Sequence, residues 1–275
     1  MKKLLPLIFI VLLLIAGFFG YKFLNKKAKP AEEPTTISKV KVEKVNQLPL
    51  EQRPYIIIEP KSQTRPQDLG SWITVTIDKV DNYQSVEYDV EYQAGSLIQG
   101  FMHRIDFSKE TPPYFKEGFF GSESKGKYKY DENVKSGNIL FKFFKDSSNY
   151  DALKTYFNLQ NMQQENGVFS SNDTKAVLTV TAGNLTPQDY IVIASTLGLP
   201  EQPRGEVISE PYGFYAARQT KLTKASLTIK TGKDFNSAKI LGWDGKTWQE
   251  YETTTQQGEA TAQVDQLGTF VLVNE

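Results

Sequence analysis

Hydrophobic and polar residues alternate along most of the chain after residue 55. In the segment 85–93, SVEYDVEYQ, valine and tyrosine alternate with glutamate, aspartate and glutamine. A period of two residues predicts a strand with one buried face. Other segments have strand length and are rich in β-branched and aromatic residues; they lie at 71–78, 96–107, 137–144, 175–183, 189–195, 224–232 and 268–275.

A helical pattern is almost absent from this part of the chain. DALKTYFNLQNM (151–162) offers one helical alternative, because Leu153 and Phe157 are four residues apart, although TYFNLQ also suits a strand. Short strands separated by turn residues indicate an all-β fold of antiparallel β-sandwiches. Since an immunoglobulin-like sandwich has ~100 residues, we expect two such domains, at 51–183 and 184–275. A single elaborated sandwich is the alternative.

The chain begins with an apolar segment. Residues 4–21 contain no charge, and Lys22 is the one charged residue between 4 and 24. A bilayer is spanned by about 20 apolar residues, so we expect residues 1–24 to form a transmembrane signal anchor. Residues 25–50 are rich in Lys, Glu, Pro and Thr, which predicts a flexible linker. A cleaved signal peptide is the alternative, although a small-x-small cleavage site is poorly formed.

Lysines flank the apolar segment on both sides, so the positive-inside rule leaves its orientation nearly undecided. The character of the downstream chain leads us to expect a single-pass protein of the cell membrane, contacting the bilayer through residues 4–24. The globular part would be extracytoplasmic; a secreted protein is the alternative.

Composition excludes several kinds of chemistry. The 32 basic and 32 acidic residues give zero net charge, which argues against a nucleic-acid partner. The chain has no cysteine, so disulfides, thiolate zinc sites and a cysteine nucleophile are excluded. His103 is the single histidine and lies on the same face as Phe101 and Ile105 of its strand, which favours a structural role. We expect no metal and no cofactor.

The C-terminal sequence resembles a known module. An aromatic strand (PYGFYA), a LTIK strand, the hairpin GWDGKTW and a closing GTFVLV strand occur between residues 211 and 273. This order resembles an Ig-like C-terminal sandwich module of bacterial secreted and surface proteins, related to sandwiches of ankyrins and netrin receptors. The resemblance implies an extracytoplasmic β-sandwich with an interaction or structural role and no catalytic residue.

GWDGKTW (242–248) places Trp243 and Trp248 on either side of Asp244-Gly245. Asp-Gly favours a turn that requires positive φ, so the two tryptophans are expected to form a cross-strand pair in a β-hairpin. The alternative is a carbohydrate-binding platform, which would require both indole rings to be exposed and roughly coplanar.

A lysine-rich segment is the second candidate contact surface. Lys125, Lys127 and Lys129 follow a phenylalanine-rich stretch and lie in a polar sequence that contains glycine. A basic loop of this kind would meet acidic polymers or phospholipid headgroups. The other interpretation is a solvated hairpin loop whose phenylalanines lie in the core. The partner is expected to be an unknown protein or glycan.

Three short motifs resemble those of penicillin-recognising serine enzymes: Ser122-x-x-Lys125, Tyr156-x-Asn158 and Lys230-Thr231-Gly232. Those enzymes place the serine at the start of a helix, whereas residues 121–133 have turn chemistry. We therefore expect a binding, adhesion or scaffolding protein without catalysis, with the serine hydrolase as a distant alternative. Acidic-polar loops such as 146–151 lack the spacing of known calcium sites.

Overall fold

The computed structural model describes residues 44–274 except 64, 66, 67, 233, 234 and 236. In these residues the elements are β-strands and one short 3-10 helix, η1 (Leu50–Gln52), so the predicted all-β antiparallel class is confirmed. The segment 151–162, for which a helix was the alternative, forms a strand. The predicted membrane span at 4–24 and the linker up to residue 43 lie outside the described residues. No helix within the described part of the chain has the length and apolar character to cross a bilayer.

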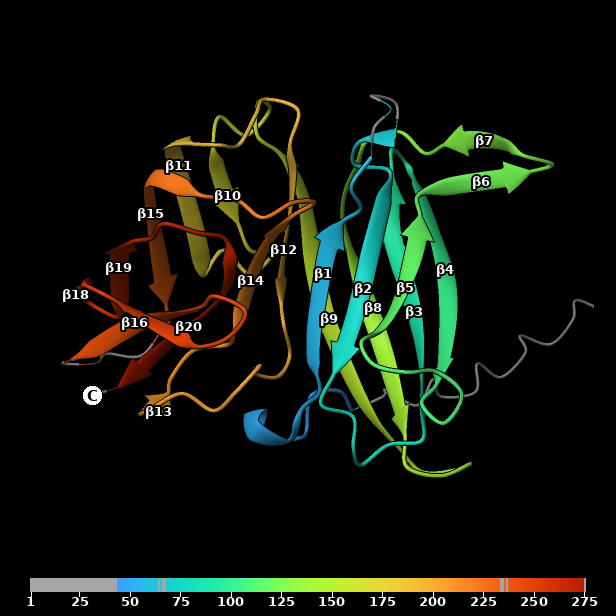
Figure 1. The fold of residues 1–275 in the computed structure, drawn as a ribbon, viewed down its shortest axis with the longest axis horizontal. Helices are drawn as coiled ribbons and strands as arrows, with labels where there is room; N and C mark the ends of the chain where they lie inside the picture. The colour runs from blue at the N-terminus through green and yellow to red at the C-terminus, as the bar shows by residue number, and fades with distance from the viewer. Residues whose placement is uncertain (1–43, 64, 66–67, 233–234, 236, 275) are drawn as a thin grey trace, which may run out of the picture. The chain divides into compact units, whose positions relative to one another are not determined.

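One long sheet runs through the described part of the chain (Figure 1). In spatial order its strands are β17 (Trp248–Tyr251), β16 (Ala238–Trp243), β20 (Gly268–Asn274), β14 (Tyr212–Ala216), β12 (Tyr190–Ser195), β9 (Tyr150–Asn161), β8 (Val134–Phe144), β3 (Ser85–Ala94) and β4 (Leu97–Asp106), with β13 (Glu206–Val207) paired to β20. Every strand pair in it is antiparallel.

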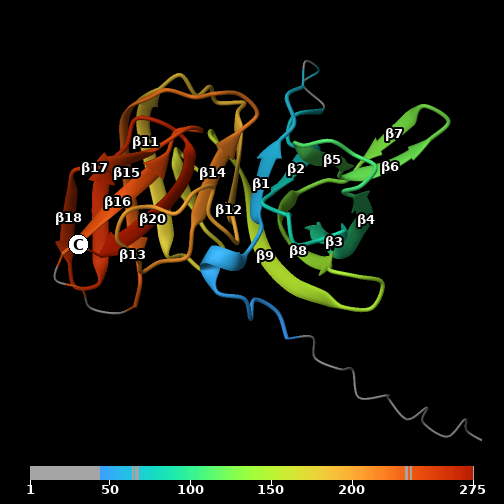
Figure 2. The same ribbon diagram turned by 60° about the horizontal axis from the view of Figure 1, so that its bottom comes forward.

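Three smaller sheets accompany the long one. A three-stranded sheet contains β1 (Tyr55–Pro60), β2 (Trp72–Asp78) and β5 (Tyr114–Phe119). A five-stranded sheet contains β10 (Val168–Ser170), β11 (Ala176–Gly183), β15 (Leu222–Lys230), β19 (Glu259–Gln263) and β18 (Thr253–Gln256). The strands β6 (Gly121–Ser124) and β7 (Lys127–Tyr130) form a separate hairpin that extends away from the body of the molecule (Figures 1 and 2).

The long sheet is shared by two hydrophobic cores. The first core lies between the three-stranded sheet and the β3–β8–β9 end, and the second lies between the five-stranded sheet and the β12–β14–β20–β16 end. Strand β12 contributes to both: Val192 and Ala194 belong to the first core, whereas Ile191 and Ile193 belong to the second. Because successive strand residues point to opposite faces, the two cores lie on opposite sides of one sheet.

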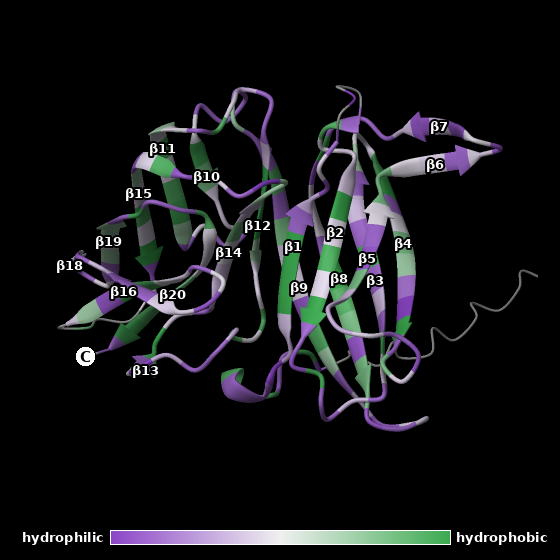
Figure 3. Ribbon diagram, viewed as in Figure 1, coloured by the Kyte–Doolittle hydropathy of each residue, from purple (hydrophilic) through white to green (hydrophobic). Residues whose placement is uncertain are grey.

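The residue alternation seen in the sequence determines which faces are buried. The alternating valines and tyrosines of β3 are all buried in the first core, and the intervening acidic residues face outward. The same banding of apolar and polar positions is visible along the other strands (Figure 3). Each fully buried large apolar side chain contributes about 1.5–3 kcal/mol relative to an exposed one.

Residues 44–275 form one compact unit. Strands β9 and β12, which lie on either side of the expected domain boundary at 183/184, pair directly with each other. Strand β11 precedes that boundary and places Ala176, Leu178 and Val180 in the second core. Residues 44–50, at the end of the expected linker, belong to the compact unit, and Leu48 and Leu50 pack against buried residues.

Candidate functional site

The two tryptophans of GWDGKTW face each other across the β16–β17 hairpin. Trp243 and Trp248 are register partners, and their ring centroids lie 5.4 Å apart. The ring planes meet at 64°, an edge-to-face arrangement that is favourable for aromatic pairs. Both side chains are half-buried. Since the rings are far from coplanar, they do not present one flat surface on which a sugar could stack.

The turn between the tryptophans is closed by Asp244. Its carboxylate accepts hydrogen bonds from the backbone N–H groups of Lys246 and Thr247, both at 2.8 Å. These N–H donors, that of Thr247 first, hold the pKa of Asp244 below its usual range. Gly245 has φ +97°, as expected from the Asp-Gly signal. The hairpin conformation therefore accounts for each residue of the turn.

Trp248 is also fastened to the body of the protein. Its indole Nε1 donates a hydrogen bond to the backbone carbonyl of Glu201 at 3.0 Å. The ring packs on a small cluster of buried residues that includes Leu199 and Leu241. The hydrogen bond and this packing attach the hairpin to the loop at Glu201.

The three candidate lysines lie together on the β6–β7 hairpin. Lys125 stands at the turn with φ +52° and is followed by Gly126 with φ +75°, so both central turn residues have positive φ. Lys127 and Lys129 pair with Ser124 and Ser122. Paired residues share one face of a hairpin, so the two lysines and two serines form one polar face. The side chains of all three lysines and both serines are exposed.

The opposite face of this hairpin is aromatic. Tyr128 and Tyr130 alternate with the lysines and lie against Trp72 and Phe119, the register pair that joins β2 to β5. The ring centroids of Trp72 and Phe119 are 4.6 Å apart. The Phe119 centroid also lies 5.4 Å from the centroid of each tyrosine ring. The Lys61 ammonium lies 5.0 Å from the Trp72 centroid. We call Trp72, Phe119, Tyr128 and Tyr130 the aromatic base of the hairpin.

A buried carboxylate completes the attachment. Asp68 is 1% exposed and accepts a hydrogen bond from the Tyr130 hydroxyl. Its carboxylate also forms an ion pair with Arg65 Nε at 2.6 Å. The Tyr130 hydroxyl and then Arg65 hold the pKa of Asp68 below its usual range. Sequence analysis did not identify Asp68 or Trp72. No short motif signals them, because their partners are distant in the sequence.

The three motifs that resemble a serine hydrolase lie on different sheets. Ser122 and Lys125 are exposed on the β6–β7 hairpin rather than at a helix start. Tyr156 lies on β9 of the long sheet, and its pair partner is Asn138. Lys230 lies on β15 of the five-stranded sheet, where its ammonium forms an ion pair with Glu259 at 2.6 Å. The folded chain therefore does not reproduce the helix-based arrangement that these motifs require.

His103 is half-buried on β4. The rings of Tyr88 and Phe101 lie with their centroids 5.5 Å from that of the imidazole. Burial lowers the pKa of His103, and the nearby Lys116 ammonium lowers it further, against an opposing hydrogen bond to the backbone of Glu117. These surroundings match the structural role expected from the sequence.

The acidic-polar loops use their oxygens internally. The Asp146 carboxylate accepts hydrogen bonds from the backbone N–H groups of Ser148 and Asn149, at 2.8 and 2.9 Å. Asp173 accepts the Tyr212 hydroxyl at 2.8 Å. Across the described residues, no group of three or more His, Asp or Glu side chains is arranged to hold a metal ion.

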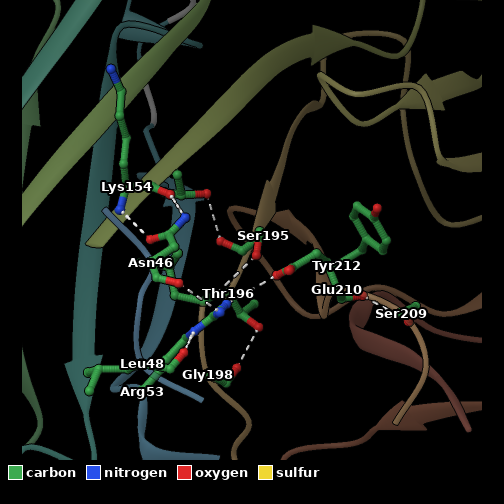
Figure 4. A network of polar contacts seen from close by, with 12 residues as sticks. Asn46, Leu48, Arg53, Lys154, Ser195, Thr196, Gly198, Ser209, Glu210 and Tyr212 are labelled. Carbon is green, nitrogen blue, oxygen red and sulfur yellow. Dashed lines mark hydrogen bonds and ion pairs between the residues drawn. The ribbon is translucent and has the colours of Figure 1, made fainter. Parts of the chain in front are cut away.

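Polar contacts hold the N-terminal segment of the compact unit against β9 and the loop between β13 and β14 (Figure 4). We call this region, where the two cores adjoin, the seam. The side-chain amide of Asn46 donates to the backbone carbonyl of Lys154 at 3.0 Å and accepts from its N–H at 2.8 Å. Arg53 donates through Nε to the carbonyl of Leu48 at 2.8 Å and forms an ion pair with Glu210 at 3.4 Å. The chain thus enters the folded unit at a defined, hydrogen-bonded position.

The loop that follows β12 is shaped to receive this segment. Leu197 is buried with φ +62°, a conformation that is strained for a leucine. Thr196 Oγ1 donates to the carbonyl of Gly198 at 2.9 Å. A Cβ at Gly198 would lie 2.2 Å from the backbone oxygen of Arg53, so only glycine permits this approach. The conformation of this loop therefore allows the N-terminal segment to pack closely against it.

Comparison of the chain with protein-family models, with curated proteins and with solved structures finds no match.

Proposed function

We propose that this chain is a membrane-tethered, extracytoplasmic β-sandwich protein with a binding or scaffolding role and no catalysis. In this proposal residues 4–24 anchor the protein. Two Ig-like β-sandwiches form the part beyond the membrane, and the presence of two separate cores supports them. The resemblance of residues 211–273 to a module of bacterial secreted and surface proteins supports the location.

The observation that supports binding most directly is the β6–β7 hairpin. It extends from the body of the molecule and presents Lys125, Lys127 and Lys129 to solvent. Glu123 is the acidic residue in the hairpin, and its carboxylate is engaged by the backbone N–H of Gly126 at 2.5 Å. The aromatic base and Asp68 attach the hairpin firmly to the three-stranded sheet. A basic surface held in this way fits an anionic polymer of the cell envelope.

The binding proposal is tested with polyphosphate as the anionic probe and the full-length chain in detergent. The triple variant Lys125→Gln, Lys127→Gln, Lys129→Gln is compared with a control of equal charge change, Lys135→Gln, Lys224→Gln, Lys246→Gln, at three exposed lysines on other elements. At about 0.2–1 kcal/mol for each exposed ionic contact, the hairpin variant should bind about threefold to a hundredfold more weakly. Equal affinities of the two triple variants would contradict the proposal.

The location proposal is tested with single cysteines, because the chain has none of its own. Ser124→Cys, on the exposed hairpin, should react with a membrane-impermeant maleimide in cells whose plasma membrane is intact. The matched variant Lys2→Cys, before the predicted span, should react only after permeabilisation. The reverse labelling pattern would show that the orientation is wrong.

A further inference from the structure

The outer face of the long sheet at its β4–β3–β8–β9 end carries exposed apolar and aromatic residues between charged ones. Ile98 is 80% exposed, Met102 69% and Tyr156 50%. The opposite face of the same strands is buried in the first core. The outer face lies opposite to the one covered by the three-stranded sheet, and the β6–β7 hairpin forms a separate sheet.

Two neighbouring rows of register partners cross this face at right angles to the strands. One row contains Gly100, Glu91, Asn138 and Tyr156, which pair in that order from β4 to β9. The second row contains Met102, Asp89, Leu140 and Lys154. Because register partners project to the same side, all these side chains border one strip of surface. We call this strip the cross-strand groove.

The strip is hollowed along its length. A depression of about 400 Å³ is lined by residues of both rows, including Glu91, Gly100 and Lys154. A Cβ at Gly100 would lie 2.5 Å from the backbone oxygen of Val90, so glycine permits a close backbone approach at the β4 end of the first row. A second hollow of about 170 Å³ lies at the seam and is also lined by Lys154, together with Tyr156 and Asn172. Lys154 lines both hollows.

The groups along the cross-strand groove are mixed donors, acceptors and one aromatic ring. The Glu91 carboxylate accepts, and the Asn138 amide both donates and accepts; the two are already 3.3 Å apart. The Lys154 ammonium donates and lies 5.1 Å from the centroid of the Tyr156 ring, half of whose surface remains exposed. Sugar hydroxyls, like those of serine, donate and accept at once, and apolar sugar faces pack on aromatic rings.

The direction of the groove excludes the usual mode of peptide binding. An extended peptide gains main-chain hydrogen bonds by adding to a sheet edge, whereas this groove crosses the sheet face, where backbone groups are already paired. From β4 to β9 the groove crosses three strand intervals of about 4.8 Å, or about 14 Å. A linear oligosaccharide of a few units has this length. Carboxylates and an ammonium in one strip also disfavour a strongly charged polymer.

We propose that the cross-strand groove binds a neutral linear oligosaccharide, with Tyr156 as the stacking residue and Glu91, Asn138 and Lys154 as hydrogen-bonding residues. This site is separate from the β6–β7 hairpin and from the tryptophan pair at Trp243. Its existence does not depend on the proposed anionic partner.

The chain offers a matched control for Tyr156. Tyr150 is a second exposed tyrosine of β9, 42% exposed, with the Lys142 ammonium 5.7 Å from its ring centroid. It projects from the same face but is paired with Phe144, three rows away from the row of Tyr156 and Asn138. Tyr156→Ala and Tyr150→Ala therefore remove similar side chains in similar surroundings, inside and outside the groove.

The test is calorimetric titration of the full-length chain, in a detergent without a sugar headgroup, with cellotetraose, xylotetraose, mannotetraose and chitotetraose. At least one tetrasaccharide should bind. Tyr156→Ala should weaken it by about tenfold, Tyr156→Phe should retain it, and Tyr150→Ala should leave it within about twofold. Thermal unfolding of each variant shows that it is folded. Absence of binding by all four probes, or equal losses in the two alanine variants, would overturn the proposal.

The hairpin variant separates the two proposals. Lys125→Gln, Lys127→Gln, Lys129→Gln should leave tetrasaccharide binding unchanged while it weakens polyphosphate binding. If this variant instead abolished tetrasaccharide binding, the sugar site would lie at the hairpin and the cross-strand groove would be refuted.

Discussion

Replacing Ile193 with alanine should destabilise both halves of the molecule, although its side chain lies in the second core alone. Ile193 is 0% exposed, and its neighbour Val192, also 0% exposed, belongs to the first core. Strand β12, which contains both residues, pairs with β9 on one side and β14 on the other. Loss of either core would therefore leave an unpaired sheet edge and an open core on the other side, so the halves should unfold together.

The magnitude follows from complete burial. An isoleucine-to-alanine change in a core costs about 2–5 kcal/mol, and for a unit of this size each kcal/mol lowers the melting temperature by about 2–4 °C. A cost of about 3 kcal/mol thus corresponds to about 6–12 °C. Val192→Ala removes two buried methyl groups at about 0.8 kcal/mol each, plus a cavity contribution, for about 2 kcal/mol.

Tryptophan fluorescence during urea unfolding can follow each half separately. Trp72 lies on the sheet that closes the first core, and Trp243 and Trp248 lie on the β16–β17 hairpin at the other end. In a Trp72→Phe background the signal reports the second half; in a Trp243→Phe, Trp248→Phe background it reports the first. Ile193→Ala should shift both transitions equally. A shift confined to the second-half signal would refute the coupling through the shared sheet.

Two further predictions concern single half-buried positions. Burial and Lys116 depress the pKa of His103 in the folded state, so the unfolded chain binds that proton more readily below its own pKa of about 6.5. The free energy of unfolding should therefore decrease as the pH is lowered from about 7 to about 5. His103→Gln should make this decrease smaller, as measured by urea unfolding at both pH values. An unchanged pH dependence in the variant would contradict the prediction. Gly137→Ala would place a Cβ 2.4 Å from the Glu91 carbonyl and 2.6 Å from the Phe157 ring. The substitution should lower the free energy of unfolding by about 1–3 kcal/mol, measured by thermal unfolding. A neutral effect would show that the strands separate easily to make room for the Cβ.

Local pattern was sufficient to locate most strands. The alternation at 85–93 determined a strand and its buried face, because the side-chain period of a strand is two residues whatever its partners are. The Asp244-Gly245 signal determined a hairpin for the same kind of reason: positive φ at Gly245 is a property of a few consecutive residues. Both are short-range effects.

Pattern could not decide the segment 151–162, because its apolar spacing fits both a helix and a strand. The structure makes it β9, whose partners β8 and β12 supply the backbone hydrogen bonds. The same holds for the candidate sites. Lys125, Lys127 and Lys129 could be chosen from composition, but Asp68 and Trp72 act through partners far along the chain. The cross-strand groove exists only in the register of four strands.

The sequence by itself therefore determined the all-β class, the strand faces, the tight turns and the exclusion of cysteine chemistry, since each depends on residue type or on neighbours a few positions apart. The tertiary structure decided that one sheet serves two cores, that β12 faces both, and that Glu91, Asn138 and Tyr156 form a row. Strand order and register are set by the packing of distant segments against each other, and no local pattern contains that information.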